Sequence, residues 1–492
     1  MEFIDLYSLL GVEPNATTNE LRQAYRLAAR RFHPDVNRAP GATVVFQNIN
    51  EAYEVLSDHS RRLEYDRLWQ DRSASMPGIL VETLYSRHYV KPLAEPQLLY
   101  VLIKLQPLLE MSLTSDAPLN LSLVVDRSTS MKGARLQHVK NAVHRIIDQC
   151  DEQDIVSLIT FSDTAELLIP AQHPADPRSL KSLISTVRAD GATAIYSGLR
   201  MAMEQIERNR HTRYVNHIVL ITDGRTYGDE DDCLQLASEA HDLGIGISGM
   251  GIGEDWNDRF LDQMAQQTGG DSVYISSVEA VTRFLSERIR SLATAYAERT
   301  NLVVASSPSA RLESVTRTAP RALTLDLETQ PIPLGSLDGT SGARFVLQFH
   351  IDASESTLGE NLFVGRIDIS GEVLGSGNPQ ERVIEDLYVE VTDEDTADEP
   401  PPELLDALSR LALYRLQDRA REALDDGDIV EATRKLEYLA TRLFENGQDA
   451  LAQTALLEAR TVSQTRHLSE QGAKQLKYGT RALFSLLGDD DG

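Results

Sequence analysis

The chain has 492 residues, enough for three or more domains of ordinary size. Its 48 basic and 75 acidic side chains give a formal net charge of −27, which argues against binding to nucleic acid or to an anionic membrane. There are two cysteines, too few for a disulfide framework or a thiolate zinc site. No basic signal region and no membrane-length apolar run stands out, so we expect a cytoplasmic protein.

The first 70 residues are predicted to be helical. Thr17 and Glu20 have the spacing of a capping box, and apolar residues then recur at helical intervals. We expect two helices that pack antiparallel, a short third helix and a polar linker, at residues 17–32, 46–56, 61–69 and 71–78. Such a linker has a coil dimension of roughly 16 Å and would keep this helical domain close to the next one.

A turn of unusual composition separates the two longer helices. It contains His33, Pro34 and Asp35, and the helix before it carries a basic stripe at steps of four residues, formed by Arg22, Arg26 and Arg30. A basic stripe can attract an acidic surface of another protein. Taken alone, the turn could equally be a plain capped loop and the arginines a solvated face.

The sequences "DLYSLLGV", "ELRQAYRLAARRFHPD" and "FQNINEAYEVLSDHSRRLEYD" together resemble a J domain over residues 1–70. The resemblance implies binding to a seventy-kilodalton heat-shock chaperone and stimulation of its ATP hydrolysis. His33, Pro34 and Asp35 would then couple binding to hydrolysis, and Arg22, Arg26 and Arg30 would supply attraction. The zinc module and the glycine/phenylalanine-rich segment of general co-chaperones are absent from the sequence, which indicates a specialised class of J protein.

The middle of the chain has two kinds of pattern. Residues 79–117 and 298–393 alternate with a period of two, which predicts a β-sandwich. Between them, residues 118–297 alternate apolar strands with helical patterns, as in a doubly wound parallel sheet, so we expect an α/β domain inserted in the sandwich. The glycine-rich stretch at 244–254 lacks the Lys-Ser/Thr of a phosphate loop and is interpreted as a buried strand and its turn.

The end of the chain is predicted to be helical. An acidic, proline-bearing segment at residues 394–402 is typical of a linker, because like charges and prolines resist packing. Helical patterns follow over residues 403–492. The expected fold class is therefore multidomain α/β, with helical domains at both ends.

Polar side chains interrupt the α/β region where its strands end. Asp126, Ser128 and Ser130 follow the first strand, Asp223 follows a later one, and Thr193 precedes an intervening helix. In a sheet of strand order 3-2-1-4-5-6 these strand ends are neighbours at the point where ligands bind. Hydroxyl and carboxylate oxygens suit Mg²⁺, with Mn²⁺ or Ca²⁺ as alternatives, whereas zinc would call for His or Cys. One such fragment alone could simply cap a helix.

Residues 118–297 resemble a von Willebrand factor type A domain with a metal-ion-dependent adhesion site. The matching pattern is Asp-x-Ser-x-Ser, then Thr, then Asp, in "VVDRSTSMKG", "DGATAIYSGL" and "HIVLITDG". The resemblance implies direct ligation by Ser128, Ser130 and Thr193, with Asp126 and Asp223 often reached through water. A carboxylate from a partner protein would complete the coordination sphere. Arg127 departs from the family pattern and could alter how a partner approaches.

We therefore expect a co-chaperone, not an enzyme. Its expected partners are the seventy-kilodalton chaperone and an unidentified protein with an exposed acidic residue, with no nucleic acid or membrane. An alternative is a metal-dependent scaffold for assembling a ring-ATPase or metal-chelating complex. A metal-dependent hydrolase is a remote alternative, because the motif contains no general base.

Overall fold

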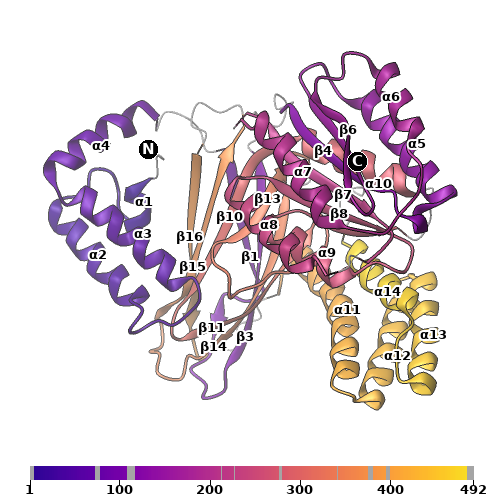
Figure 1. Cartoon of the computed structure of the whole chain (residues 1–492). Helices are drawn as coiled ribbons and strands as arrows, with labels where there is room; N and C mark the ends of the chain where they lie inside the picture. The colour runs from indigo at the N-terminus through magenta and orange to yellow at the C-terminus, as the bar shows by residue number, and fades with distance from the viewer. Residues whose placement is uncertain are drawn as a thin grey trace. The chain divides into compact units, whose positions relative to one another are not determined.

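The computed structural model describes residues 5–72, 78–107, 117–211, 213–225, 228–275, 280–340, 342–374, 380–394 and 399–484. The chain forms two compact units. The first comprises Met1–Thr114, Tyr296–Leu337 and Ser341–Leu408, and the second comprises Ser115–Ala295, Asp338–Thr340 and Ser409–Gly492. Figure 1 shows the chain coloured by residue number.

The first unit begins with four helices, α1 (Leu6–Leu10), α2 (Thr18–Phe32), α3 (Ala42–Leu56) and α4 (His59–Arg72). The predicted capping box is present at the start of α2, because the Thr17 hydroxyl accepts from the Glu20 amide and the Glu20 carboxylate accepts from the Thr17 amide. The last helix is longer than expected: it starts at His59 and includes residues 71 and 72 of the expected linker. Residues 73–77 of that linker lie outside the described residues.

The β-sandwich has two five-stranded sheets. One has the order β1-β3-β14-β11-β12 and the other β13-β10-β15-β16-β2. Their bounds are β1 Ile79–Tyr85, β2 Tyr89–Val90, β3 Gln97–Pro107, β10 Ala295–Ser306, β11 Ala310–Ala319, β12 Leu323–Thr324, β13 Ile332–Asp338, β14 Ala343–Ile351, β15 Asn361–Val373 and β16 Gln380–Val391. Because β3 pairs directly with β14, segments from both sides of the α/β region share one sheet, and the predicted insertion is confirmed.

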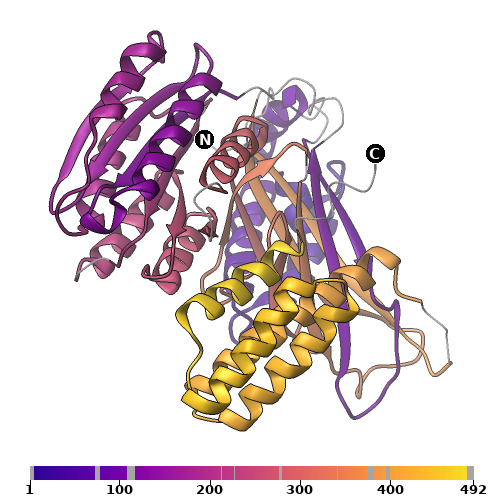
Figure 2. The same cartoon turned by 90° about the vertical axis from the view of Figure 1, so that its right-hand side faces the viewer.

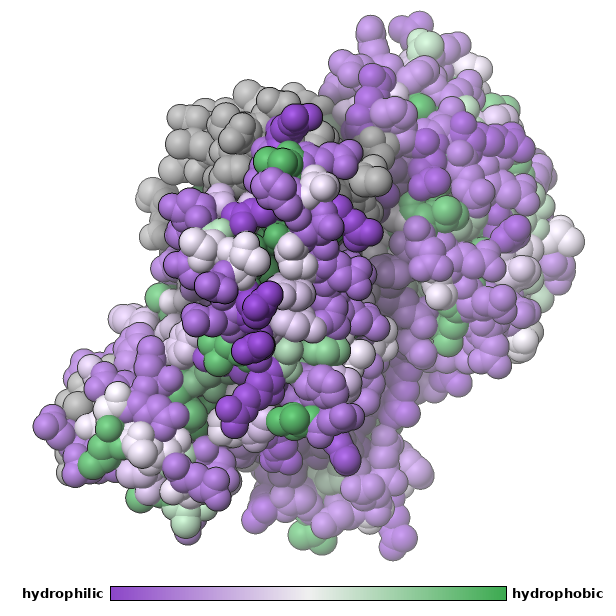
Figure 3. All heavy atoms as spheres, turned by 90° about the vertical axis from the view of Figure 1, so that its left-hand side faces the viewer, coloured by the Kyte–Doolittle hydropathy of each residue, from purple (hydrophilic) through white to green (hydrophobic). Residues whose placement is uncertain are grey.

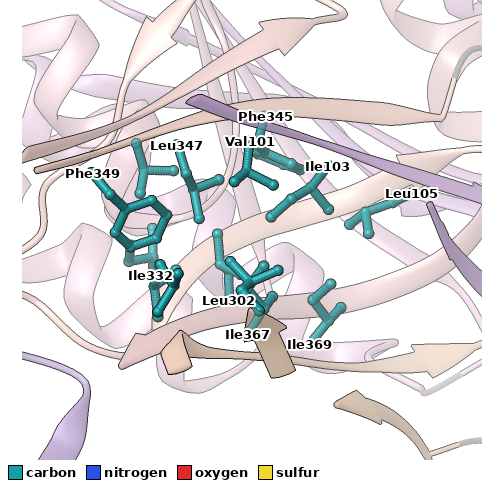
Figure 4. Packing of buried hydrophobic residues seen from close by; sticks show 14 of the residues in the cluster. Val101, Ile103, Leu105, Leu302, Ile332, Phe345, Leu347, Phe349, Ile367 and Ile369 are labelled. Atoms are coloured by element: carbon teal, nitrogen blue, oxygen red, sulfur yellow. The ribbon is translucent and has the colours of Figure 1, made fainter. Parts of the chain in front are cut away.

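The sandwich core explains the period-two pattern of the sequence. Alternate residues of β14, including Phe345, Leu347 and Phe349, point toward Leu302 and Ile367 of the opposite sheet (Figure 4). Alternate side chains of a strand lie on one face, so one apolar face per sheet is enough to build such a core. The second block of strands starts at Ala295, slightly before the boundary expected at 298.

The second unit contains a six-stranded sheet of order β6-β5-β4-β7-β8-β9, which corresponds to the expected order 3-2-1-4-5-6. Its strands are β4 Leu119–Asp126, β5 Ile155–Phe161, β6 Ala165–Gln172, β7 Val215–Thr222, β8 Gly246–Ile252 and β9 Ser272–Ile275. All neighbours are parallel except β5 and β6, so the expected doubly wound sheet is mixed, with one antiparallel strand, β6, at its edge. β6 follows β5 through a short turn, and a turn of that length can join only antiparallel strands.

Helices cover both faces of this sheet (Figure 2). They are α5 Ala134–Gln149, α6 Pro177–Thr186, α7 Ile195–Arg208, α8 Glu230–Asp242, α9 Asp258–Gln267 and α10 Ala280–Ala293. The central strands β4, β5 and β7 are buried along their whole length, which is why they are near-continuous apolar runs in the sequence. Side chains of α7, α8 and α9 share one core cluster with them.

The C-terminal region is helical, as predicted, and its described residues form α11 Pro402–Asp425, α12 Ile429–Glu445, α13 Asp449–Thr465 and α14 Glu470–Ala482. Figure 2 shows them as a bundle in yellow and orange. Pro402, the last residue of the expected acidic linker, is already the first residue of α11, whereas residues 395–398 and 485–492 lie outside the described residues.

Within the first unit the four N-terminal helices pack on the sandwich. Phe32 at the end of α2 lies edge-on to Phe363 of β15, with ring centroids 5.9 Å apart, and the Arg31 guanidinium lies 4.4 Å from the same ring. The Asn37 amide donates to the Ser306 carbonyl at 2.8 Å, and buried Arg366 donates to the Leu9 carbonyl at 2.8 Å. This contact was not anticipated from the sequence, which had indicated only a short tether.

Candidate functional site

Two neighbouring strand ends bring the predicted oxygen donors together. β4 ends at Asp126, and β7 ends directly before Asp223. The strands are parallel, with Val125 opposite Ile221, so both carboxylates lie at the same edge of the sheet. Since ligands of doubly wound folds bind at this edge, the position is the one predicted for the site.

The two serines lie between the carboxylates. A single turn of 3₁₀ helix, Thr129–Met131, follows β4 and places the Ser128 and Ser130 hydroxyls 3.0 Å apart. The Ser130 hydroxyl donates to one Asp223 oxygen at 2.6 Å. Three of the predicted ligands, from segments more than 90 residues apart, are therefore in direct contact.

Asp126 is fully buried and supports the loop from beneath. One of its oxygens accepts from the Ser128 amide at 2.7 Å, and the other accepts from the Thr222 hydroxyl at 2.6 Å. Burial raises the pKa of Asp126 to about 6, against the opposing effect of the hydrogen bonds from Thr222 and Ser128. Keeping the buried Asp126 carboxylate ionised thus costs free energy, and a nearby cation would reduce that cost.

Thr193, the fifth predicted ligand, is buried beside the same edge. Its hydroxyl lies 3.1 Å from the point where a side chain at residue 224 would begin, and that residue is a glycine. A larger residue next to Asp223 would therefore crowd the Thr193 hydroxyl. The structure brings all five predicted residues to one edge of the sheet, and four of them are joined by hydrogen bonds.

Two residues of the site were missed by the sequence analysis. Thr222 holds Asp126, and Arg135 of α5 donates to the second Asp223 oxygen at 2.6 Å. Thr222 directly precedes a predicted ligand, and its position was a usable signal. Arg135 gave no such signal, because it lies 88 residues from its acidic partner in the sequence.

The donors suit a hard cation. Three hydroxyl oxygens and two carboxylates converge, and such oxygen sets favour Mg²⁺, Mn²⁺ or Ca²⁺. Among the described residues no group of three or more His, Cys, Asp or Glu side chains could hold a metal ion, so these residues offer no His- or Cys-rich zinc site. Arg127, which departs from the adhesion-site pattern, has its guanidinium 3.9 Å from Glu166 of β6.

The His33-Pro34-Asp35 turn is internally hydrogen-bonded and accessible. The Asp35 amide donates to the His33 ring at 3.1 Å, and that ring lies edge-on to Phe46 of α3. The Asp35 side chain is 86% exposed, so its carboxylate is available to a partner. A loop that presents an exposed carboxylate and is hydrogen-bonded beneath it is a suitable arrangement for recognition.

The basic stripe of α2 is also accessible. Arg22, Arg26 and Arg30 are exposed, whereas Leu21, Ala28 and Phe32 of the same helix are buried. Figure 3, viewed from the side of the N-terminal helices, shows a mostly hydrophilic surface with scattered hydrophobic residues. The packing on the sandwich therefore leaves the stripe and the His33-Pro34-Asp35 turn uncovered.

The last helix contacts loops next to the oxygen cluster. Lys474 of α14 donates to the Trp256 carbonyl at 2.7 Å, and Arg225, two residues after Asp223, contacts Glu470 at 2.6 Å. Further along α14, Arg481 pairs at 2.8 Å with Asp262 of α9, whose side chain is 13% exposed. The C-terminal helices are thus joined to the α/β domain by a polar interface.

None of the helices in the described part of the chain is both long and apolar enough to cross a membrane.

Comparisons with known proteins divide the chain in the same way. The DnaJ domain profile matches residues 5–66, and the von Willebrand factor type A profile matches residues 120–287. A third profile, the Sll0103-like C-terminal alpha-helical domain, matches residues 402–486. The chain carries a DnaJ domain, a von Willebrand factor type A domain and a Sll0103-like C-terminal domain.

Individual relatives agree with this composition. The protein sll0103 of Synechocystis is 27% identical over 333 residues, which cover 66% of this chain and 78% of that protein. The chaperone protein DnaJ of a Roseiflexus strain is 50% identical over 74 residues, but these are only 15% of this chain and 20% of that protein. The matched domains therefore support a J-domain co-chaperone that also carries a protein-interaction domain.

A comparison with solved structures shows that most of this chain shares its fold with a known protein. A von Willebrand factor type A protein from Catenulispora acidiphila matches with a TM-score of 0.65, covering 82% of this chain and 97% of that one. Its sequence is 15% identical, so the similarity shows a shared fold alone.

Proposed function

We propose that this protein is a co-chaperone that holds a partner protein at its von Willebrand factor type A domain while its DnaJ domain recruits a seventy-kilodalton heat-shock chaperone. The observation that supports this most is that one chain has both an exposed His33-Pro34-Asp35 turn and a convergent set of oxygen donors. Linking two binding modules raises the local concentration of one partner near the other, to the millimolar range for a short link.

In the DnaJ domain, Asp35 and His33 would couple chaperone binding to ATP hydrolysis, with Pro34 fixing the turn between them. The exposed carboxylate of Asp35 and the His33 ring, which accepts a hydrogen bond from the Asp35 amide, support this role. Arg22, Arg26 and Arg30 would attract an acidic surface of the chaperone.

In the von Willebrand factor type A domain, Ser128, Ser130 and Thr193 would hold Mg²⁺, with Mn²⁺ or Ca²⁺ as alternatives, and Asp126 and Asp223 would balance its charge. A bound ion of this kind supplies a Lewis-acidic position that accepts a carboxylate from the partner protein. The neutral hydroxyls of the two serines leave more of the ion's charge for that carboxylate. This is a binding role, and we propose no covalent chemistry for it.

The experiment compares two variants of the full chain. One should lose stimulation of the chaperone ATPase, and the other should lose capture of the partner protein. Asp35→Asn should abolish stimulation of the chaperone ATPase and leave partner capture intact, because Asp35 is an exposed side chain of the DnaJ domain. Ser128→Ala/Ser130→Ala should abolish capture and leave stimulation intact. ATP turnover measures the first property, and mass spectrometry of proteins released from immobilised chain by a chelator measures the second.

Exposed Arg200, on α7 of the same domain, offers a control: Arg200→Gln should change neither property. Full ATPase stimulation by Asp35→Asn would contradict the co-chaperone role. Capture that survives both the serine substitutions and the chelator would contradict docking through a metal.

A further inference from the structure

The residue that bears on the strength of the proposed cation site is Arg135. It lies in the first turn of α5, and its Nη1 donates to Asp223 Oδ2 at 2.6 Å and to the Ser130 carbonyl at 3.5 Å. The Asp223 side chain has no exposed surface, and the Arg135 side chain is 35% exposed. A guanidinium keeps its positive charge throughout the physiological range. The buried carboxylate therefore has a permanent internal counter-charge.

The two oxygens of Asp223 have different partners. Oδ1 accepts from the Ser130 hydroxyl at 2.6 Å, on the side of the proposed ligands, and Oδ2 accepts from Arg135. A divalent cation held by Ser128 and Ser130 would share this carboxylate with the guanidinium. Two positive groups would then draw on one negative charge, and they would repel each other at short range.

The loop after β8 lies next to the Arg135 guanidinium. The backbone of the loop after β8 lies against the guanidinium, since a side-chain carbon built on Gly253 would come within 2.9 Å of Nη2. The same loop is held by α14, through the contact of Lys474 with the Trp256 carbonyl. The guanidinium thus lies between Asp223 and a loop that is itself anchored, while 35% of the Arg135 side chain is exposed.

We propose that Arg135 is a built-in competitor of the divalent cation, which keeps the cation affinity of the site low until a partner's carboxylate adds a compensating negative charge. The inference rests on the proposed function, because it concerns the same oxygen cluster. It makes the binding of the cation and of an acidic partner mutually reinforcing, and such coupling is reciprocal by thermodynamic necessity.

The opposite role would be positioning. If Arg135 served to orient Asp223 for the cation, removing it would misplace a ligand and weaken binding. The competitor role predicts tighter binding after removal. The sign of the change in affinity therefore separates the two roles.

The experiment measures Mg²⁺ and Mn²⁺ binding to the chelator-treated full chain by titration calorimetry. Arg135→Gln and Arg135→Met both remove the charge, and the Met variant keeps an apolar stem of similar length. Both should lower the dissociation constant by about tenfold or more, while Arg135→Lys stays near the wild-type value. Thermal unfolding with and without Mn²⁺ gives a second readout: both neutral variants should be stabilised more by the ion than the wild type is.

Control variants separate the possible failures. Arg200→Gln removes an exposed charge from the same domain and should leave the affinity unchanged. Ser128→Ala/Ser130→Ala should abolish binding in every background. If the wild type binds the ion and the neutral Arg135 variants bind it equally or more weakly, this inference is wrong and the proposed function stands. If neither the wild type nor the neutral variants bind, the metal-dependent function fails together with the inference.

Discussion

Gly251 lies in β8 with its backbone against the indole ring of Trp256. A side-chain carbon built on Gly251 would come within 2.0 Å of that ring, and Trp256 is itself buried, with its Nε1 donating to the Gly253 carbonyl at 2.9 Å. The glycine-rich sequence at 244–254 is therefore explained at this position by close packing. Its interpretation as a buried strand and turn agrees with the observed β8.

Gly251→Ala should lower the free energy of unfolding by about 2 kcal/mol or more, because the added methyl group displaces a buried indole. Urea unfolding followed by far-ultraviolet circular dichroism measures this loss, because this readout does not depend on Trp256. In a Trp256→Leu background the same substitution should cost less, since the smaller side chain can yield. An equal cost in both backgrounds would show that the ring is not the cause.

The oxygen cluster shows what can be predicted at the scale of residues. Asp126, Ser128 and Ser130 are close in sequence and follow a strand whose apolar run is plain, so their convergence could be predicted from spacing. Asp223 follows from the same rule applied to a second strand. Arg135 could not be predicted, because a helix residue meets a distant strand end only through the packing of the whole domain.

A buried ion cluster joins α14 to α9. Lys477 and Arg481 of α14 both pair with Asp262 of α9, at 2.7 and 2.8 Å. Burial alone would raise the pKa of Asp262, but the positive charges of Arg481 and Lys477 outweigh it and hold the pKa well below its usual value. The ionised form of Asp262 is thus the one that stabilises the interface.

Asp262→Asn should lower the free energy of unfolding by about 3 kcal/mol at pH 7, because it leaves two buried cations short of a counter-charge. The pKa of Asp262 is lower in the folded than in the unfolded chain. Its stabilising effect is therefore complete above about pH 4 and is lost as the pH falls further. Denaturation of wild type and variant from pH 7 to pH 2 should show the gap between them closing in acid.

The matched control is Asp425→Asn, which removes the acidic partner of Arg259 from an exposed pair. Exposed pairs contribute about 1 kcal/mol or less, so this variant should differ little from wild type at any pH. A gap between wild type and Asp262→Asn that stays constant down to pH 2 would contradict the assignment of the acid dependence to Asp262.

The sheet of the α/β domain shows what can be predicted at the scale of elements. Mostly apolar runs identified β4, β5, β7 and β8, because strands buried on both faces carry few polar residues. The direction of β6 was not predicted, since its partly exposed residues give a weaker pattern. The length of the turn was the available signal: β5 ends at Phe161 and β6 starts at Ala165, too close for a crossover.

At the scale of the whole molecule, the sequence predicted the domains and their order but not how the DnaJ domain is held. Composition suggested only a short polar linker there. The observed contact with the sandwich depends on Phe32, Arg31 and Asn37 meeting Phe363 and Ser306 across more than 260 intervening residues. Period and spacing carry no information about pairs so distant.

Phe363→Ala should loosen the DnaJ domain without inactivating it. The substitution removes the ring that contacts Phe32 and Arg31, so amide exchange in the last turn of α2 should become about tenfold faster or more. Stimulation of the chaperone ATPase should persist, because His33, Asp35 and the exposed arginines are not altered. Hydrogen exchange with mass spectrometry measures the first effect.

Leu358→Ala is the control, because Leu358 is an exposed apolar residue on another part of the sandwich. It should leave exchange in α2 unchanged. Equal exchange rates in wild type and Phe363→Ala would mean that the packing of the helices on the sandwich does not persist in solution.

The packing of the DnaJ domain on the sandwich also limits which homologous DnaJ domains could replace it. Gly41 runs so close to the Val304 carbonyl that an added side-chain carbon would come within 2.4 Å of that oxygen. A DnaJ domain from another protein, with a bulkier residue in place of Gly41 or without the Asn37 amide, should lose these contacts with the sandwich. Its stimulation of a chaperone ATPase should not depend on them. Such a chimera would keep stimulation of the chaperone ATPase but lose the fixed orientation of the DnaJ domain on the sandwich. It would show whether that orientation matters for the function of the protein.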